Sequence, residues 1–130
     1  MSWEVKFNAE KSIVEAICRG TTTGKDLREM TSKCIALGDA RGTCEFLIDA
    51  HDVEFFASLT EFYNIPAKQF LAEGLCRSSR IALIQPASQE ARFAARFFEN
   101  ACRKRSWNVL LFSCREDAVD WLVKQERRTR

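Results

Sequence analysis

Short apolar segments typical of β-strands alternate with amphipathic segments typical of helices along most of this chain. The first two strand patterns are joined only by Ala9–Lys11, so they must pair antiparallel, because a parallel pair needs a long crossover. Each later strand is separated from the next by a helix pattern, which favours parallel pairing. The predicted strands are Trp3–Asn8, Ser12–Arg19, Cys44–Ile48, Arg80–Gln85 and Asn108–Phe112. The sequence therefore predicts an α/β fold, a five-stranded mixed sheet with about four helices in the order ββαβαβαβα.

The helix patterns have recognisable start and stop residues. Gly38 ends the first helix, Asn64–Pro66 interrupts an aromatic second helix, and Pro66 suits the first turn of a further short helix. Ser88 is an N-cap for the clearest helix, whose alanines share one face. The last helix begins within Ser113–Glu116. The other predicted helices are Lys25–Leu37, Ala67–Glu73 and Ser88–Arg105.

The stretch Thr43–Phe56 is predicted to carry the functional surface. Its pattern predicts a buried strand, Cys44–Ile48, then a polar turn, Asp49–Asp52, and then an aromatic helix capped by Asp52. Loops at the carboxyl ends of parallel strands are where open α/β sheets meet ligands and partners. We therefore predict that this turn contacts a partner through Asp49, His51, Asp52 and Val53.

The stretch Gly20–Asp26, GTTTGKD, invites comparison with a phosphate-binding loop. That loop requires GxxxxGK followed by Ser or Thr, but here the two glycines are one residue too close and Asp26 replaces the hydroxyl residue. An acidic side chain at a helix start favours the helix dipole and repels phosphate. The sequence instead predicts a loop, Gly20–Gly24, and a helix capped by Thr23 together with Asp26.

Length and composition fit one globular domain spanning residues 1–130, with 46% hydrophobic and 29% charged residues. No apolar run approaches the roughly 20 residues of a membrane span. The N-terminus has no apolar signal-peptide core, so we expect a cytoplasmic protein. The net charge is only +2, and no nucleic-acid motif or set of interleaved aromatics accompanies the basic residues. We interpret these residues as solubilising surface and expect no nucleic-acid partner.

Six cysteines and one histidine are present, and no two cysteines have a CxxC spacing. A structural zinc site needs about four clustered ligands, which this pattern does not supply. The cysteines fall mostly in apolar strand and helix patterns, so we expect free and mostly buried thiols. We therefore expect no metal and no cofactor.

His51 and its neighbours Asp49 and Asp52 form the histidine–carboxylate cluster of the chain. A catalytic interpretation would make His51 a general base oriented by a carboxylate. Residues this close along one turn seldom converge, and no nearby Ser or Cys is an obvious nucleophile. We therefore expect a protein that is not an enzyme. Two interpretations of the cluster stay open, a polar recognition turn or simple capping and turn chemistry.

Two aromatic groups each allow two interpretations. The first surrounds the interrupted helix and is either core packing or an apolar pocket. Its members are Phe55, Phe56, Phe62, Tyr63 and Phe70. The second lies at the border of the inward face of the helix that Ser88 caps, and is either a core edge or a partner patch. Its candidate partner-binding residues are Phe93, Arg96 and Phe97.

Three stretches, in chain order, resemble the SpoIIAA-like branch of the STAS family, also called STAS/SEC14. They are CRGTTTGKDL at Cys18–Leu27, RIALIQPASQEARFAARFFE at Arg80–Glu99 and VLLFSCREDAVDWL at Val109–Leu122. The resemblance spans the whole chain and implies the fold of anti-sigma-factor antagonists. In those antagonists a phosphorylatable Ser or Thr follows the third strand, whereas this chain reads Asp-Ala-His-Asp there.

The resemblance implies a non-enzymatic regulatory or protein-interaction module of bacterial type that lacks this phosphorylation switch. A protein partner is expected, and a homodimer is compatible both with this interpretation and with the alternative. The alternative is a carrier or sensor of a small apolar, lipid-like ligand in the aromatic pocket. A cavity of roughly several hundred cubic ångströms would favour the carrier, and a tightly packed aromatic core would favour the interaction module.

Overall fold

A computed structural model describes residues 3–128, with side chains as far as Val123. The strands are β1 (Trp3–Asn8), β2 (Ile13–Thr23), β3 (Glu45–Phe56), β4 (Arg80–Ile84) and β5 (Asn108–Phe112). The helical elements are α1 (Gly24–Arg41), α2 (Leu59–Asn64), the π-helical η1 (Ile65–Gln69), α3 (Phe70–Ala72), α4 (Gln89–Lys104) and α5 (Arg115–Arg128). Because α2, η1 and α3 follow one another without a gap, residues 3–128 form four helical units, as predicted.

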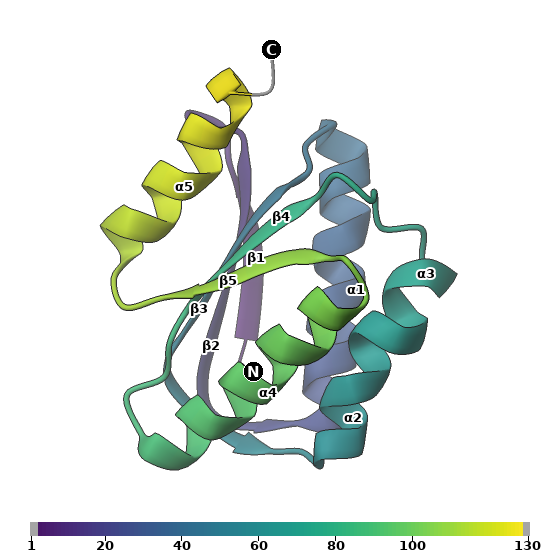
Figure 1. Cartoon of the computed structure of the whole chain (residues 1–130), viewed down its shortest axis with the longest axis vertical. Helices are drawn as coiled ribbons and strands as arrows, with labels where there is room; N and C mark the ends of the chain where they lie inside the picture. The colour runs from purple at the N-terminus through teal and green to yellow at the C-terminus, as the bar shows by residue number, and fades with distance from the viewer. Residues whose placement is uncertain (1–2, 129–130) are drawn as a thin grey trace.

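The strands form one sheet in the order β1-β2-β3-β4-β5 (Figure 1). β1 pairs antiparallel with β2, and every other neighbouring pair is parallel. The predicted mixed sheet, with one antiparallel strand at its edge, is therefore confirmed. The short connection after β1 forces the antiparallel pair, and the helical crossovers allow the parallel ones.

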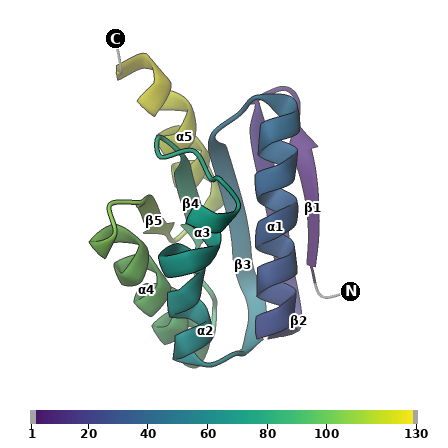
Figure 2. The same ribbon diagram turned by 90° about the vertical axis from the view of Figure 1, so that its right-hand side faces the viewer.

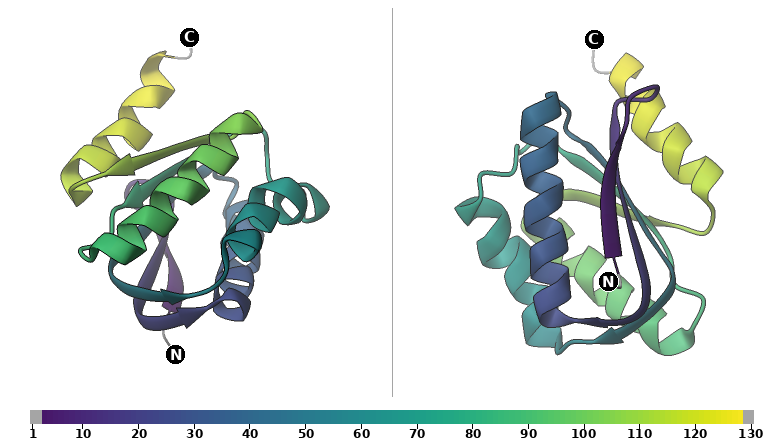
Figure 3. Two further views of the ribbon diagram at one scale, coloured as in Figure 1. Left: turned by 60° about the horizontal axis from the view of Figure 1, so that its bottom comes forward. Right: turned by 180° about the vertical axis from the view of Figure 1, so that it is seen from behind.

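The helices cover the two faces of the sheet unequally. α1, the α2–α3 unit and α4 lie side by side across one face (Figure 2), while α5 lies on the opposite side of the sheet from α1 (Figure 3, right). Two apolar clusters result. Phe46 and Leu83 belong to the larger cluster, and Leu47 and Ala82 belong to the smaller one under α5. Successive strand residues thus point to opposite faces, as strand geometry requires.

Two ion pairs, Arg80–Glu45 and Arg115–Glu15, lie between α5 and the sheet. Arg80 donates to Glu45 Oε2 at 2.6 Å and to the carbonyl of Leu122 at 3.2 Å. Glu15 Oε2 accepts from Arg115 at 2.7 Å and from Asn8 Nδ2 at 2.9 Å. Burial alone would raise the pKa of Glu15, but these two hydrogen bonds and the positive charges of Arg115 and Lys6 together hold the pKa below its usual value.

The first helix is longer than predicted. α1 does not end at Gly38 but continues to Arg41, and Gly42 closes it in the left-handed conformation. Gly38 is instead a packing residue, because a Cβ there would lie 2.9 Å from the Phe46 ring and 3.1 Å from the carbonyl oxygen of Thr43. Position 38 is a glycine because α1 and β3 approach closely there, and not because the helix ends there.

The predicted loop Gly20–Gly24 is wrong, since β2 runs on to Thr23 and α1 begins at Gly24. The predicted cap is confirmed, and it is a capping box. Thr23 Oγ1 accepts from Asp26 N at 3.1 Å, and Asp26 Oδ2 accepts from Thr23 N at 2.9 Å.

The second helix neither begins nor breaks as predicted. Asp52 lies within β3, and the N-cap of α2 is Ser58, which forms a capping box with Glu61. Pro66 does not interrupt the helix, nor does Ala67–Glu73 form a separate one. Proline has no N–H to complete an α-helical bond, and here the helix widens into the π-turn η1.

Candidate functional site

The polar segment Asp49–Asp52 is a β-bulge within a continuous strand, so the predicted turn is wrong. Ile17 of β2 pairs with Asp49, but Arg19 pairs with Asp52, so that two residues of β3 oppose one of β2. Asp49 Oδ1 accepts from the backbone N of His51 at 3.0 Å, which satisfies a donor that the bulge takes out of the ladder. The bulge therefore explains why a polar sequence lies inside a strand.

Beyond the bulge, β2 and β3 continue as a two-stranded parallel ribbon. Arg19–Thr23 pairs with Asp52–Phe56, while the ladder between β3 and β4 ends at Asp49 and Ile84. We call residues 19–23 and 52–56 the ribbon. It curls across one end of the helical layer (Figure 1, bottom; Figure 3, left).

The two faces of the ribbon differ in burial. Val53 is only 4% exposed and Phe55 packs against Phe62, with ring centroids 5.0 Å apart. Asp52, Glu54 and Phe56 alternate with them and are exposed. Val53, one of the candidate partner-binding residues, is therefore a core residue. The period-two alternation from Asp52 to Phe56 is the sequence signal that could have identified the strand.

His51 and Asp52 lie together on the surface. His51 Nδ1 is 3.0 Å from Asp52 Oδ1, and both side chains are exposed. An exposed pair of neighbouring residues can offer one charge-assisted contact to a partner. The side-chain partner of His51 is thus a carboxylate and not a nucleophile, and we derive no catalytic step from this pair.

The start of α4 lies beside the bulge. Ala87 N donates to the carbonyl of His51 at 2.9 Å, and Ser88 caps α4 as predicted by accepting from Ala91 N at 3.2 Å. Two candidate residues of α4, Phe93 and Arg96, are exposed, whereas Phe97 is half-buried against the larger core. The structure therefore brings the β3 candidates and the α4 candidates to the same end of the molecule.

Two large aromatic side chains are exposed there. Phe56, at the end of β3, is 77% exposed, and Phe93, in the second turn of α4, is 65% exposed. Acidic and basic side chains accompany them. We call this surface the ribbon–α4 face, and it consists of His51, Asp52, Glu54, Phe56, Phe93 and Arg96.

The predicted aromatic pocket is divided by the structure. Phe55, Phe62 and Phe70 line an almost wholly apolar cavity of about 90 Å³ between the sheet and the helices. Phe56 and Tyr63 lie outside it, on the surface. The Tyr63 hydroxyl hydrogen-bonds to Arg105, whose guanidinium lies 5.0 Å from the Tyr63 ring centroid.

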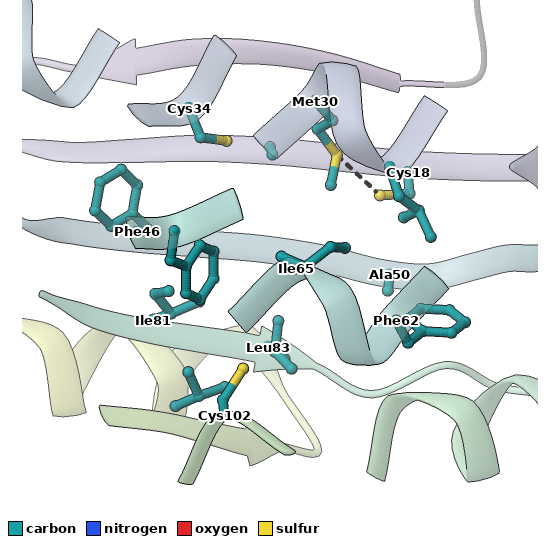
Figure 4. Close-up of a cluster of buried hydrophobic side chains, with 14 of the residues drawn as sticks. Cys18, Met30, Cys34, Phe46, Ala50, Phe62, Ile65, Ile81, Leu83 and Cys102 are labelled. Carbon is teal, nitrogen blue, oxygen red and sulfur yellow. Dashed lines mark hydrogen bonds between the residues drawn. The ribbon is translucent and has the colours of Figure 1, made fainter. Parts of the chain in front are cut away.

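Sulfur atoms form part of the cavity wall. Figure 4 shows those of Cys18, Met30 and Cys34 among the buried apolar side chains. Cys18 Sγ donates to Met30 Sδ at 3.2 Å, and Cys34 lies nearby on α1. Burial raises the pKa of both the Cys18 and the Cys34 thiol to about 12, so both stay protonated at neutral pH. These thiols act as small apolar groups, and within the described residues no cluster of three or more His, Cys, Asp or Glu could hold a metal ion.

None of the helices in the described part of the chain is both long enough and apolar enough to cross a membrane.

Comparison with known proteins gives a fold and no established activity. No family model matches the chain, and no curated protein matches it. A solved structure does match, with a TM-score of 0.57 and 21% sequence identity, covering 92% of this chain and 91% of the other. It is the crystal structure of an uncharacterized protein of the DUF3478 family with a SpoIIAA-like fold, from Shewanella loihica PV-4. The chain therefore has a SpoIIAA-like fold, as its sequence resemblance implied.

Proposed function

We propose that this protein is a non-enzymatic, cytoplasmic regulatory module that binds a protein partner through the ribbon–α4 face. One observation carries the proposal: two large aromatic side chains are exposed, Phe56 on the ribbon and Phe93 on α4, and the hydrogen bond from Ala87 N to the carbonyl of His51 joins these two elements. Aromatic side chains are enriched in interface cores and among the residues that dominate binding energy.

The charges of the ribbon–α4 face suit a polar rim around these aromatics. Asp52 and Glu54 are exposed on the ribbon and Arg96 is exposed on α4, so a partner that contacts both elements would meet both signs of charge. Rim charges of this kind set orientation and association rate more than affinity. The bulge Asp49–Asp52 carries no hydroxyl, so it lacks the Ser or Thr that is phosphorylated after the third strand in anti-sigma-factor antagonists.

The alternative function, a carrier of an apolar ligand, rests on the cavity lined by Phe55, Phe62 and Phe70. Its walls are apolar, as such a carrier needs. Its volume of about 90 Å³ is well below the roughly 300–1,000 Å³ of typical ligand pockets and below an engineered cavity of about 150 Å³ that binds benzene. The size of the cavity supports the interaction module over the carrier.

Site-specific photo-crosslinking in cells tests the proposal. A benzophenone-bearing analogue of phenylalanine replaces Phe56 or Phe93, and in a control replaces Leu71 of α3, which is 62% exposed. We expect positions 56 and 93 to capture the same protein and position 71 not to capture it. The proposal is wrong if the two ribbon–α4 positions capture nothing, or capture only what position 71 captures.

Once that protein is identified, alanine variants measure how much each aromatic side chain contributes to the binding free energy. Phe93→Ala and Phe56→Ala should each weaken binding by about 2 kcal/mol, or roughly 30-fold, if they are interface anchors. Because both side chains are exposed, the free energy of unfolding should change by no more than about 0.5 kcal/mol. Leu71→Ala, with a similar exposure, should leave binding unchanged.

A further inference from the structure

Two cysteines that are distant in sequence meet where the loop before β4 folds onto the start of β3. Cys44 immediately precedes β3, and Cys76 lies in the loop between α3 and β4. Arg80 N donates to the carbonyl of Cys44 at 2.9 Å, which holds this loop against the strand. The thiols of Cys44 and Cys76 are within hydrogen-bonding contact of each other. Both are free thiols, Cys44 half-buried and Cys76 exposed.

In the turn that follows Cys76, the Ser78 hydroxyl and the Ser78 backbone N–H lie close to the Cys76 sulfur. Ser79 N donates to the carbonyl of Cys76 at 3.0 Å and so closes the turn. Within that turn Cys76 Sγ lies 3.0 Å from Ser78 Oγ, and it also accepts from the backbone N–H of Ser78. An ionised sulfur can only accept hydrogen bonds, so these contacts favour the thiolate over the thiol.

The two cysteines are unequal in acidity. Hydrogen bonds from the Ser78 hydroxyl, the Ser78 N–H and the Cys44 thiol lower the pKa of Cys76, against smaller opposing effects of burial and of Asp39. Burial and the neighbouring Cys76 raise the pKa of Cys44. An exposed thiol of lowered pKa beside a half-buried thiol of raised pKa is the usual arrangement of an attacking and a resolving cysteine.

The turn that carries Cys76 is fixed against the end of α4. Arg77, next to Cys76 in the chain, packs its guanidinium 4.0 Å from the Trp107 ring centroid and donates to the carbonyl of Arg105 at 3.1 Å.

We propose that Cys76 and Cys44 form a thiol–disulfide exchange site that reacts with small disulfides such as glutathione disulfide. The Cys76 thiolate attacks one sulfur of glutathione disulfide, a Cys76–glutathione bond forms, and one glutathione leaves. Cys44 then loses its proton and attacks the Cys76 sulfur, forming the Cys44–Cys76 disulfide and releasing the second glutathione. The two cysteines are oxidised, one glutathione disulfide is reduced to two glutathiones, and the two cysteine protons end on the released thiols.

The other cysteines supply internal controls. Cys18, Cys34 and Cys102 are buried, and burial raises the pKa of each. Cys114 is exposed like Cys76, but within residues 3–123 no sulfur contact joins it to a second cysteine. Cys114→Ser is therefore the matched control for Cys76→Ser.

The test is to incubate the reduced full-length protein with mixtures of reduced and oxidised glutathione, trap remaining thiols by alkylation, and map the products by peptide mass spectrometry. We expect a Cys44–Cys76 disulfide in the wild type and in Cys114→Ser, and its complete loss in Cys76→Ser. Cys44→Ser should stop at a glutathione adduct on Cys76, because no resolving thiol remains. We also expect an alkylating agent to label Cys76 faster than Cys114 at neutral pH.

Circular dichroism shows whether the Cys44 variant is folded, and Cys44→Ala serves as a second substitution that adds no polar group. The proposal is overturned if the wild type forms no Cys44–Cys76 disulfide in oxidised glutathione, or if glutathione is found equally on Cys114 and Cys76. It is also overturned if a folded Cys44 variant accumulates no adduct on Cys76. These outcomes do not depend on whether the ribbon–α4 face binds a protein.

Discussion

Filling the apolar cavity should stabilise the protein, and Ala95→Val is the substitution that fills it. Ala95 of α4 is buried and lines the cavity of about 90 Å³. At about 24 cal/mol per Å³, a void of this size corresponds to about 2 kcal/mol of lost stability. Valine adds two methyl groups, worth about 1.6 kcal/mol when buried, and loses about 0.6 kcal/mol of helix propensity relative to alanine. We therefore expect a net gain of about 1 kcal/mol.

The matched control is Ala101→Val, on the same helix. Ala101 is equally buried but is not part of the cavity wall, so valine there must overpack, at a cost of about 1–3 kcal/mol in addition to the same propensity loss. Urea unfolding measures the stability of both variants. If the unfolding free energy falls by about 2 kcal/mol per molar urea, the unfolding midpoint of Ala95→Val should lie about 0.5 M higher than that of the wild type. If Ala95→Val instead lowers the unfolding free energy by as much as Ala101→Val does, the cavity is not available to the added methyl groups and the reasoning is refuted.

Two further substitutions test the packing and the electrostatics of the sheet. Gly38→Ala would ordinarily gain about 1 kcal/mol of helix propensity, but the new Cβ meets the Phe46 ring and the Thr43 carbonyl. We expect instead a loss of about 1–3 kcal/mol in urea unfolding, and a gain would contradict the close packing of α1 on β3. Arg115→Met leaves Glu15 buried without its cation and should cost about 1–2 kcal/mol at pH 7. The folded pKa of Glu15 is lowered, so the stability it adds is present above its unfolded pKa of about 4.3 and is lost as the pH falls through the folded value. The difference between wild type and variant should therefore shrink from pH 6 towards pH 3, and a constant difference would exclude Glu15 as its source.

The elements with strong local signals could be predicted from the sequence. α4 has a serine cap and a regular apolar face, and β5 has the predicted bounds, Asn108–Phe112. The hairpin followed from a connection too short for anything else. The fold class needed only these local patterns and their order along the chain.

The bulge could not be predicted in the same way, because it shifts the phase of the alternation. Before it, Phe46 and Ala50 face the larger core, and after it Val53 and Phe55 do so. A single period-two pattern therefore does not run through β3, and the polar residues at the phase shift look like a turn. Only the pairing with β2 shows that the strand continues.

Contacts between residues that are far apart in the sequence also could not be predicted. The local pattern places Cys44 in a strand and Cys76 near a turn, and nothing in either pattern predicts that they meet. Gly38 likewise resembles a helix terminus, because its function depends on the Phe46 ring of another element. Such features depend on tertiary packing, which overrides local propensity.

The central claim is that the protein acts by binding another protein at its surface and not by holding a small molecule in its interior. Native mass spectrometry of the protein purified from cells, beside a denatured sample of the same preparation, tests this most directly. We predict the mass of the bare chain, or of complexes whose added mass is that of a protein. A reproducible small-molecule increment that disappears on denaturation, and that Ala95→Val reduces, would contradict the claim and establish the cavity as the functional site.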